Sequence, residues 1–167
     1  MKPLTMASVL VDVASKEIGV EEVNGTNCGP RVNEYKAATN LPPKESWPWC
    51  AAFVCFCVRE AMAKLGIKET ETFKRPTTAG AYDLANWSRK QDNTTWTRFT
   101  PDMDIAAGDI IVYTFSHCGI AVTPPSANGT FFAIEGNTDG GGSREGGIVM
   151  KKLRKTSQVR ARIRFRA

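Results

Sequence analysis

The sequence predicts an α+β fold in which N-terminal helices pack on a C-terminal antiparallel sheet. Apolar residues recur at helical spacing through the first half of the chain, whereas short β-prone runs separated by glycine and proline turns fill the second half. Because the helices come first and the strands follow one another, an α+β arrangement is favoured over alternating βαβ units. The chain has 167 residues, of which 42% are hydrophobic. We therefore expect one domain over residues 1–167, built around one core.

Four helices are expected in the first half. They cover residues 6–18, 30–38, 48–65 and 78–90, where apolar side chains recur every three or four positions. Gly19 and Gly66 are placed to end the first and the third of them, because glycine accepts the left-handed conformation that closes many helices. Pro30 and Pro48 suit a first helical turn, where no backbone N–H is needed. The third helix has one apolar face, and that face carries Cys50.

Six strands are expected in the second half. They cover residues 96–99, 109–115, 117–123, 131–135, 147–153 and 160–165. Turn-forming residues separate them, among them Asn128-Gly129 and the glycine run 140–142. We expect these strands to form an antiparallel meander. Neither an internal repeat nor a linker interrupts the chain, which predicts a single domain without a separate binding domain.

The N-terminal residues do not resemble a signal peptide. Asp12, Lys16 and Glu17 interrupt the apolar residues of the segment 1–19, and no small-residue cleavage site follows. No stretch approaches the roughly 20 apolar residues that a membrane span needs, so no transmembrane segment is expected. We expect synthesis in the cytoplasm without a signal peptide; if the protein acts elsewhere, another factor must release it.

The formal net charge is +5, and eight basic residues crowd into the last seventeen positions. They are Lys151, Lys152, Arg154, Lys155, Arg160, Arg162, Arg164 and Arg166. One interpretation is a basic, solvated edge strand whose charges block edge-to-edge pairing. The other is a contact with an anionic polymer or membrane, which salt would weaken. Nucleic acid is not expected as a partner, because no zinc-finger spacing, helix-turn-helix pattern or aromatic platform accompanies the charge.

The chain holds five cysteines and a single histidine. The odd number of cysteines and the lack of a signal peptide argue against a disulfide framework. Cys55, Cys57 and Cys118 lie within apolar elements and are expected to be core residues. The Cys55-x-Cys57 spacing is not the Cys-x-x-Cys of a zinc knuckle. We therefore expect no metal and no other cofactor.

Cys50 is the candidate nucleophile, because it lies at or near the start of the third predicted helix. Backbone amides at a helix N-terminus are unpaired and carry partial positive charge. They stabilise a thiolate and lower the pKa of the thiol, and the same amides can hold an oxyanion after the sulfur attacks a carbonyl. The alternative is that Cys50 is a small core residue on an apolar helix.

His117 is the candidate base. It stands at the start of an otherwise apolar strand, where an isolated imidazole needs a partner or a cleft, although a lone histidine is more often structural. A thiolate partner would make it a general acid and base. Glu135 and Asn137, at the end of the following predicted strand, are candidates to orient the second ring nitrogen. By itself, that segment would be read as an ordinary strand end with polar turn residues.

Four segments together carry a resemblance to a known family. They are 47–54 (Trp-Pro-Trp-Cys-Ala-Ala-Phe-Val), 108–113 (Gly-Asp-Ile-Ile-Val-Tyr), 117–122 (His-Cys-Gly-Ile-Ala-Val) and 135–138 (Glu-Gly-Asn-Thr). Their order and spacing resemble the CHAP domains of phage endolysins and bacterial cell-wall hydrolases, within the NlpC/P60 and papain-like group. The likeness extends from the N-terminal helix to about residue 153. It implies a papain-like α+β fold and cleavage of an amide bond in bacterial peptidoglycan.

The resemblance also implies residue roles. Cys50 matches the nucleophile, His117 the base, Glu135 the acid that orients the histidine, and Asn137 a nearby polar residue of the same site. In NlpC/P60 relatives the third residue is often a second histidine, so the single histidine of this chain favours the CHAP type. The expected function is that of a cysteine-dependent peptidoglycan amidase or endopeptidase, a phage lysis enzyme that acts as a monomer on the cell wall. Anionic wall polymers would then be the expected partner of the basic C-terminal region.

The chain departs from the family pattern in two respects. Some CHAP endolysins carry an acidic calcium loop before the cysteine, but the matching stretch 24–46 has only Glu34 and Glu45 as acids, so no calcium is expected. No glutamine precedes the cysteine to donate a side-chain hydrogen bond to the oxyanion. Tyr35 and Asn33 are the nearest polar residues for that role.

Three other functions remain open at this point. A cysteine protease or transferase on the same scaffold would differ only in its substrate. A delivered antibacterial amidase toxin would need a dedicated immunity partner. A non-catalytic cell-wall-binding module would keep the fold and have an unreactive Cys50. The full set of Cys50, His117, Glu135 and Asn137 argues against the third of these.

Overall fold

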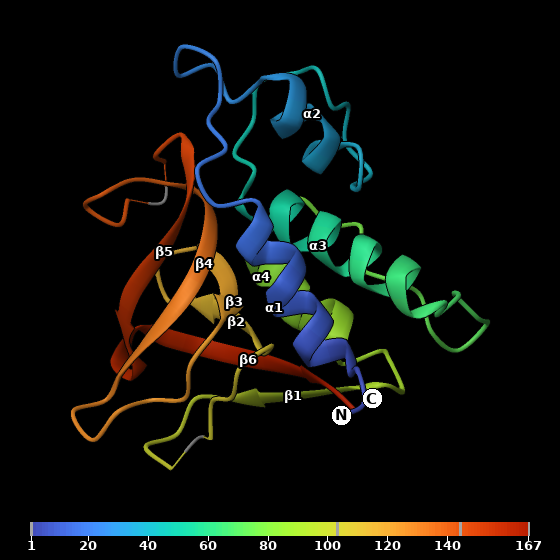
Figure 1. Cartoon of the computed structure of the whole chain (residues 1–167), viewed down its shortest axis with the longest axis vertical. Helices are drawn as coiled ribbons and strands as arrows, with labels where there is room; N and C mark the ends of the chain where they lie inside the picture. The colour runs from blue at the N-terminus through green and yellow to red at the C-terminus, as the bar shows by residue number, and fades with distance from the viewer. Residues whose placement is uncertain (1, 103, 144, 167) are drawn as a thin grey trace.

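The computed structural model describes residues 2–102, 104–143 and 145–166, and it confirms the predicted α+β class. The helices precede the sheet in the chain and pack against it (Figure 1). The helices are α1 (Met6–Lys16), α2 (Pro30–Lys36), α3 (Cys50–Leu65) and α4 (Ala81–Ser88). The strands are β1 (Thr94–Arg98), β2 (Ile110–Tyr113), β3 (Cys118–Ala121), β4 (Thr130–Thr138), β5 (Ile148–Lys155) and β6 (Val159–Phe165), with a 3₁₀ turn, η1 (Thr156–Gln158), before β6.

The helix boundaries are tighter than predicted, because other backbone contacts compete at the ends. α1 ends at Lys16 instead of residue 18, since the N–H of Gly19 donates to the carbonyl of Val149 on β5. Gly19 adopts a φ of 98°, which suits glycine. α4 begins only after Gly80 and ends at Ser88. Gly66 ends α3 in the left-handed conformation, as predicted.

All six strands pair antiparallel in one sheet, in the order β1-β6-β2-β3-β4-β5. Strands β2 to β5 form the expected meander. The basic C-terminal region, interpreted as an edge strand, covers two strands: β5, which carries Lys151 to Lys155, lies at one edge of the sheet as expected, whereas β6 lies between β1 and β2. At the β5 edge, the segment after α1 adds a bridge between Glu21 and Ile148.

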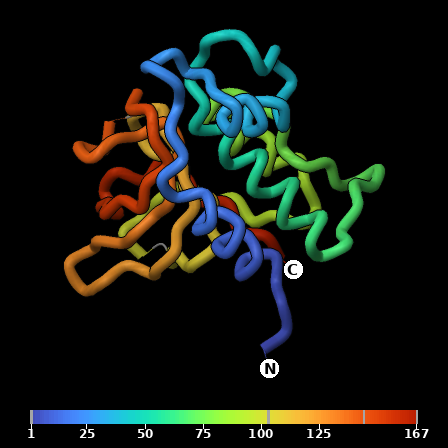
Figure 2. The backbone as a smooth tube through the Cα atoms, turned by 45° about the horizontal axis from the view of Figure 1, so that its top comes forward, coloured from blue at the N-terminus to red at the C-terminus, as the bar shows by residue number. Residues whose placement is uncertain are grey.

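The helices cover one face of the sheet, and α3 is the central helix of this layer. It packs against α1, α2, β3 and β4. Phe53 and Val54 are among its fully buried side chains. A smaller apolar cluster, which includes Ile111 and Phe131, lies apart from the main core. Figures 1 and 2 show α2 and the segments before and after it at the end of the molecule where α3 begins.

Within the described residues, no helix is both long and apolar enough to cross a lipid bilayer.

Candidate active site

Cys50 is the first residue of α3, and its surroundings follow from that position. The preceding residue, Trp49, is the N-cap and makes no side-chain capping hydrogen bond. The first-turn amides therefore keep the free donors and the partial positive charge of a helix N-terminus. The N–H of Ala51 is one of the hydrogen bonds that lower the pKa of the Cys50 thiol. Cys50 itself is buried, with 6% of the residue exposed.

His117 and Glu135 form a hydrogen-bonded pair next to Cys50. The distance from His117 Nε2 to Glu135 Oε1 is 3.0 Å, and both side chains are completely buried. Among the residues that the structure describes, none forms a hydrogen bond with the other ring nitrogen, Nδ1. Cys50 is close enough to the ring that each group shifts the pKa of the other. Since Nε2 is engaged by Glu135, Nδ1 is the nitrogen available to the thiol.

The turn that carries His117 is anchored by α4. Tyr82 of α4 donates its hydroxyl to the carbonyl of Thr114 at 2.6 Å and accepts from the N–H of Ser116 at 3.1 Å. Ser116 has a φ of 56°, an uncommon conformation for a residue with a side chain. The guanidinium of Arg160 lies 4.1 Å from the centre of the Tyr82 ring. These contacts fix the turn before β3, and this turn positions His117.

Arg154 completes the buried charge network and was missed in the sequence. Its Nε donates to Glu135 Oε2 at 2.8 Å, and its terminal nitrogen donates to Glu135 Oε1 and, at 3.1 Å, to the carbonyl of Gly142. Only 6% of Arg154 is exposed, so water screens this pair weakly. Glu135 therefore lies between two cationic partners, Arg154 and His117. In the sequence, Arg154 is one of eight basic residues near the C-terminus, and no pattern distinguishes it from the others.

The electrostatics favour an ionised Glu135 and a protonated His117. Burial raises the pKa of Glu135, but hydrogen bonds from Arg154 and His117 outweigh it and leave that pKa below its ordinary value. Burial lowers the pKa of His117, yet the contacts with Cys50 and Glu135 prevail and raise it to about 9. At neutral pH the imidazole is thus an imidazolium held between a carboxylate and the Cys50 sulfur.

Two thiols meet at the start of α3. Cys118, the first residue of β3, lies within hydrogen-bonding reach of Cys50, and this contact is the largest influence that lowers the Cys50 pKa. Burial opposes the shift, and His117 adds to it, so that the pKa falls well below its ordinary value. Burial and the neighbouring Cys50 raise the pKa of Cys118 well above its ordinary value. These opposite directions favour a thiolate on Cys50 and a protonated thiol on Cys118.

The sequence predicts that Cys55, Cys57 and Cys118 are core residues, and all three are fully buried in the main core. Cys118 differs from the other two in that it also lies next to Cys50. Burial raises the pKa of Cys55 to about 12 and that of Cys57 well above its ordinary range. Both are therefore unreactive thiols at neutral pH.

Asn137 contacts the residue before Cys50, whereas the sequence makes it a candidate to orient His117. Its Oδ1 accepts the backbone N–H of Trp49 at 2.7 Å, and its Nδ2 donates to the carbonyl of Gly146 and, at 3.4 Å, to Oδ1 of Asn27. It adopts a φ of 56°, which asparagine tolerates better than most residues. The register of β4 and β5 shifts between Glu135 and Thr138, where Asn137 lies. Asn137 therefore fixes the residue that precedes Cys50.

Two glycines allow the elements of the site to pack closely together. A Cβ on Gly119 would lie 2.5 Å from the Cγ of Glu135, and a Cβ on Gly136 would lie 2.8 Å from the Cβ of Phe53. Contacts this short do not occur between real side chains, so any larger residue would displace Glu135 or separate β4 from α3. The two glycines next to His117-Cys118 and Glu135 thus have a packing reason.

The two residues considered for the oxyanion have other roles. Tyr35 is fully buried in a ring cluster with Trp49, Phe53 and Phe56. Asn33 accepts a hydrogen bond from the N–H of Gly29 at the start of α2. In the first turn of α3, the N–H of Ala51 is a backbone donor to the Cys50 sulfur. Among the described residues, no three His, Cys, Asp or Glu side chains are grouped in a way that could hold a metal ion.

The fold is similar to that of a solved endolysin, reported as a crystal structure of wild-type LysIME-EF1. The TM-score is 0.57 at 17% sequence identity, and the match covers 96% of this chain and 64% of that chain. This chain thus spans just under two thirds of the endolysin's length, and a likeness at this identity concerns the fold. No protein-family model matches the sequence, and neither does any curated protein.

Proposed function

We propose that this chain is a cysteine-dependent hydrolase of amide bonds in bacterial peptidoglycan, a CHAP-type amidase or endopeptidase of the kind found in phage lysis enzymes. In this proposal Cys50 is the nucleophile, His117 the general acid and base, and Glu135 the residue that orients the imidazole. Asn137 supports the site by holding Trp49. Residues 1–167 form the single catalytic domain.

One observation carries the chemistry: a cysteine at a helix N-terminus shares its site with a buried His117–Glu135 pair. The pKa values of Cys50 and His117 shift in opposite directions, which is the condition for a thiolate–imidazolium pair at neutral pH. A core cysteine would have a raised pKa instead, as Cys55 and Cys57 do.

The proposed reaction is acyl transfer. The Cys50 thiolate attacks the carbonyl carbon of a stem-peptide amide, and first-turn amides of α3 stabilise the oxyanion that forms. His117 gives its proton to the leaving nitrogen, the C–N bond breaks, and an acyl thioester remains on Cys50. His117 then takes a proton from a water molecule, whose oxygen attacks the thioester. The carboxylic acid leaves and the thiolate is restored.

The substrate class rests on two supports. The first is the order of the segments around Cys50, His117 and Glu135, which resembles that of CHAP domains. The second is the similarity of the fold to that of a protein named as an endolysin. Both point to peptidoglycan in preference to a protein substrate.

The test is mass spectrometry of purified peptidoglycan after digestion. We expect new stem-peptide fragments with the unaltered protein and none with Cys50→Ala, and the newly freed amine identifies the bond that is cut. Cys57→Ala is the matched control, because Cys57 is a buried cysteine of the same helix and is unreactive. If fragments form equally with Cys50→Ala, or if walls of several chemotypes yield none with the unaltered protein, the proposed function is wrong.

A contact between the basic C-terminal region and anionic wall polymers also remains a proposal. Several of these cations already have partners within the protein: Arg154 binds Glu135, Arg164 binds Asp109 and Lys152 donates to the carbonyl of Gly140. If such a contact exists, sedimentation with purified walls should show binding that weakens as salt is raised. Binding that salt does not change would contradict it.

A further inference from the structure

Lys36, the last residue of α2, is a completely buried lysine outside the site described above. Its ammonium donates to the carbonyl of Asn27 at 2.7 Å, to the carbonyl of Glu45 and, at 3.4 Å, to the sulfur of Cys28. It also lies 4.9 Å from the centre of the Trp47 ring. An ammonium has three N–H donors, and all three are used here.

A fully buried lysine is rare, because an ion loses its hydration when it leaves water. The partners of Lys36 compensate for that loss with carbonyl dipoles, a thiol and the face of an aromatic ring. An apolar side chain of the same length would fill the volume without the desolvation cost. The ammonium must therefore contribute what a methyl group does not, which is directed hydrogen bonds to several backbone segments at once.

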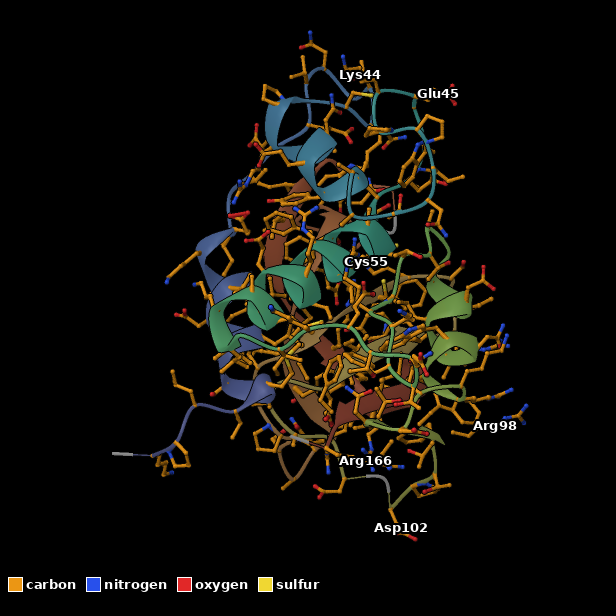
Figure 3. All side chains as sticks on the ribbon, turned by 90° about the vertical axis from the view of Figure 1, so that its right-hand side faces the viewer. Lys44, Glu45, Cys55, Arg98, Asp102 and Arg166 are labelled. Atoms are coloured by element: carbon orange, nitrogen blue, oxygen red, sulfur yellow. The ribbon has the colours of Figure 1, made fainter. Side chains whose placement is uncertain are left out.

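The acceptors belong to two loops on either side of α2. Asn27 and Cys28 lie in the first loop, residues 19–29, and Glu45 lies in the second loop, residues 37–49. Figures 1 and 2 show both loops at the end of the molecule where α3 begins, and Figure 3 labels Glu45 there. One side chain thus ties together two segments with little regular structure of their own.

Both loops are connected to Trp49, the residue before Cys50. In the first loop, Glu22 accepts the indole N–H of Trp49 at 2.8 Å. Asn27 Oδ1 accepts a hydrogen bond from Asn137, which in turn accepts the backbone N–H of Trp49. The second loop runs into Trp49 and then Cys50 along the chain. A shift of either loop would therefore move the residue that sets the start of α3.

We propose that Lys36 is a positioning residue for the reaction at Cys50, an internal cation that locks the two loops together and thereby holds the first turn of α3 against His117. The catalytic part of this inference rests on the proposed function. The structural part, that Lys36 controls the order at Trp49, does not depend on any activity.

The test compares Lys36→Met with Lys44→Met. Lys36→Met keeps a long, unbranched side chain and removes the ammonium. Lys44→Met removes the same charge from an exposed side chain of the second loop. Figure 3 shows Lys44 at the outer end of the molecule. Amide hydrogen exchange of Trp49 is followed by NMR, and kcat and KM are measured on soluble peptidoglycan fragments.

We expect Lys36→Met to speed exchange at the Trp49 amide and in the two loops by on the order of tenfold or more, with the sheet strands unchanged. We expect kcat to fall by roughly tenfold or more while KM changes little, because the reacting groups are misplaced and the binding surface is retained. Lys44→Met should alter none of these quantities.

Two results would overturn the proposal. One is unchanged exchange at Trp49 together with unchanged kcat in a folded Lys36→Met protein. The other is a loss of protection spread equally over the strands, which would make Lys36 a general contributor to stability. If Lys36→Met does not fold, Trp47→Leu removes the ring above the ammonium together with the indole N–H that donates to the carbonyl of Pro42, whereas Trp47→Phe removes that N–H and keeps a ring. The changes expected for Lys36→Met should then appear, at smaller size, with Trp47→Leu and not with Trp47→Phe; equal changes in both variants would overturn the proposal. If the unaltered protein does not cut peptidoglycan, the proposed function fails while the exchange result still decides whether Lys36 orders Trp49.

Discussion

Removal of Arg154 is the perturbation whose size the structure defines best. Arg154→Met removes the bidentate hydrogen-bond partner of the Glu135 carboxylate, which is completely buried. Only 6% of Arg154 is exposed, so solvent screening does not discount the loss. Breaking a buried pair from one side costs about 3–5 kcal/mol. His117 stays bound to Glu135, but it is shared with the Cys50 thiolate, so one negative charge in the interior is left uncompensated. For a chain of this size we expect the melting temperature to fall by about 6–20 °C.

The assay is urea denaturation of four proteins: the unaltered chain, Arg154→Met, Glu135→Gln and the double variant. The double variant should be less destabilised than the sum of the single variants, because removing both charges leaves no unpaired ion. Lys16→Met is the control, since its partner Asp12 is exposed, and its unfolding midpoint should stay where it is. A loss below about 1 kcal/mol for Arg154→Met, the size of an exposed pair, would refute the reasoning.

Three further predictions concern the site. Cys118→Ala should raise the pKa of the Cys50 thiol, measured by alkylation rate against pH, because the main hydrogen bond that lowers it is lost; Cys118→Ser, which keeps a donor, should raise it less, and equal values for both would contradict this. Turnover should be constant between the lowered pKa of Cys50 and about pH 9 and should fall above that pH, where His117 loses the proton that it gives to the leaving amine. The stability that His117 contributes to the fold is complete below pH 6.5 and is lost as the pH rises through about 9. Turnover or stability that already falls near pH 6.5 would be evidence against the raised pKa of His117. Asn137→Ala should remove the acceptor for the Trp49 N–H, destabilise the fold by about 1–3 kcal/mol in urea denaturation and lower kcat, whereas unchanged stability would show that the bond is unimportant.

Local patterns in the sequence were sufficient for the class of fold and for most elements. Helical periodicity, the glycine stop at Gly66 and the β-prone runs depend on neighbours in the chain, and these are visible in the sequence. The position of β6 between β1 and β2 was not visible, because strand order depends on contacts far apart in sequence. The basic residues of the C-terminal region suggested one edge strand; this holds for β5, but β6 lies within the sheet, where Arg164 pairs with the buried Asp109.

The candidate site was predictable where its residues stand at the ends of elements. Cys50 starts a helix, His117 precedes a strand and Glu135 follows the apolar part of one, and the structure brings these three together. The contact between Asn137 and the Trp49 backbone could not be foreseen, because it spans most of the chain and depends on the left-handed conformation of Asn137.

Arg154 and Lys36 carried no signal in the sequence. Arg154 lies among other basic residues on β5 and follows the apolar Leu153. Alternation along the strand therefore predicts a buried Leu153 and an exposed Arg154, whereas in the structure Leu153 is half-exposed and Arg154 is buried. Lys36 ends an amphipathic helix, where a lysine is ordinarily solvated. Both are buried only because distant acceptors converge on them, Glu135 for Arg154 and two loop carbonyls for Lys36.

Alkylation of Cys50, followed together with turnover, tests whether this thiol is the nucleophile. The protein is titrated with iodoacetamide at pH 6, the modified cysteine is identified by peptide mapping, and release of stem-peptide fragments from purified peptidoglycan is measured on the same samples. We predict that Cys50 is modified before Cys55, Cys57 and Cys118, because its pKa is lowered whereas theirs are raised, and that fragment release falls in proportion to its modification. If fragment release continues after Cys50 is fully modified, Cys50 is not the nucleophile.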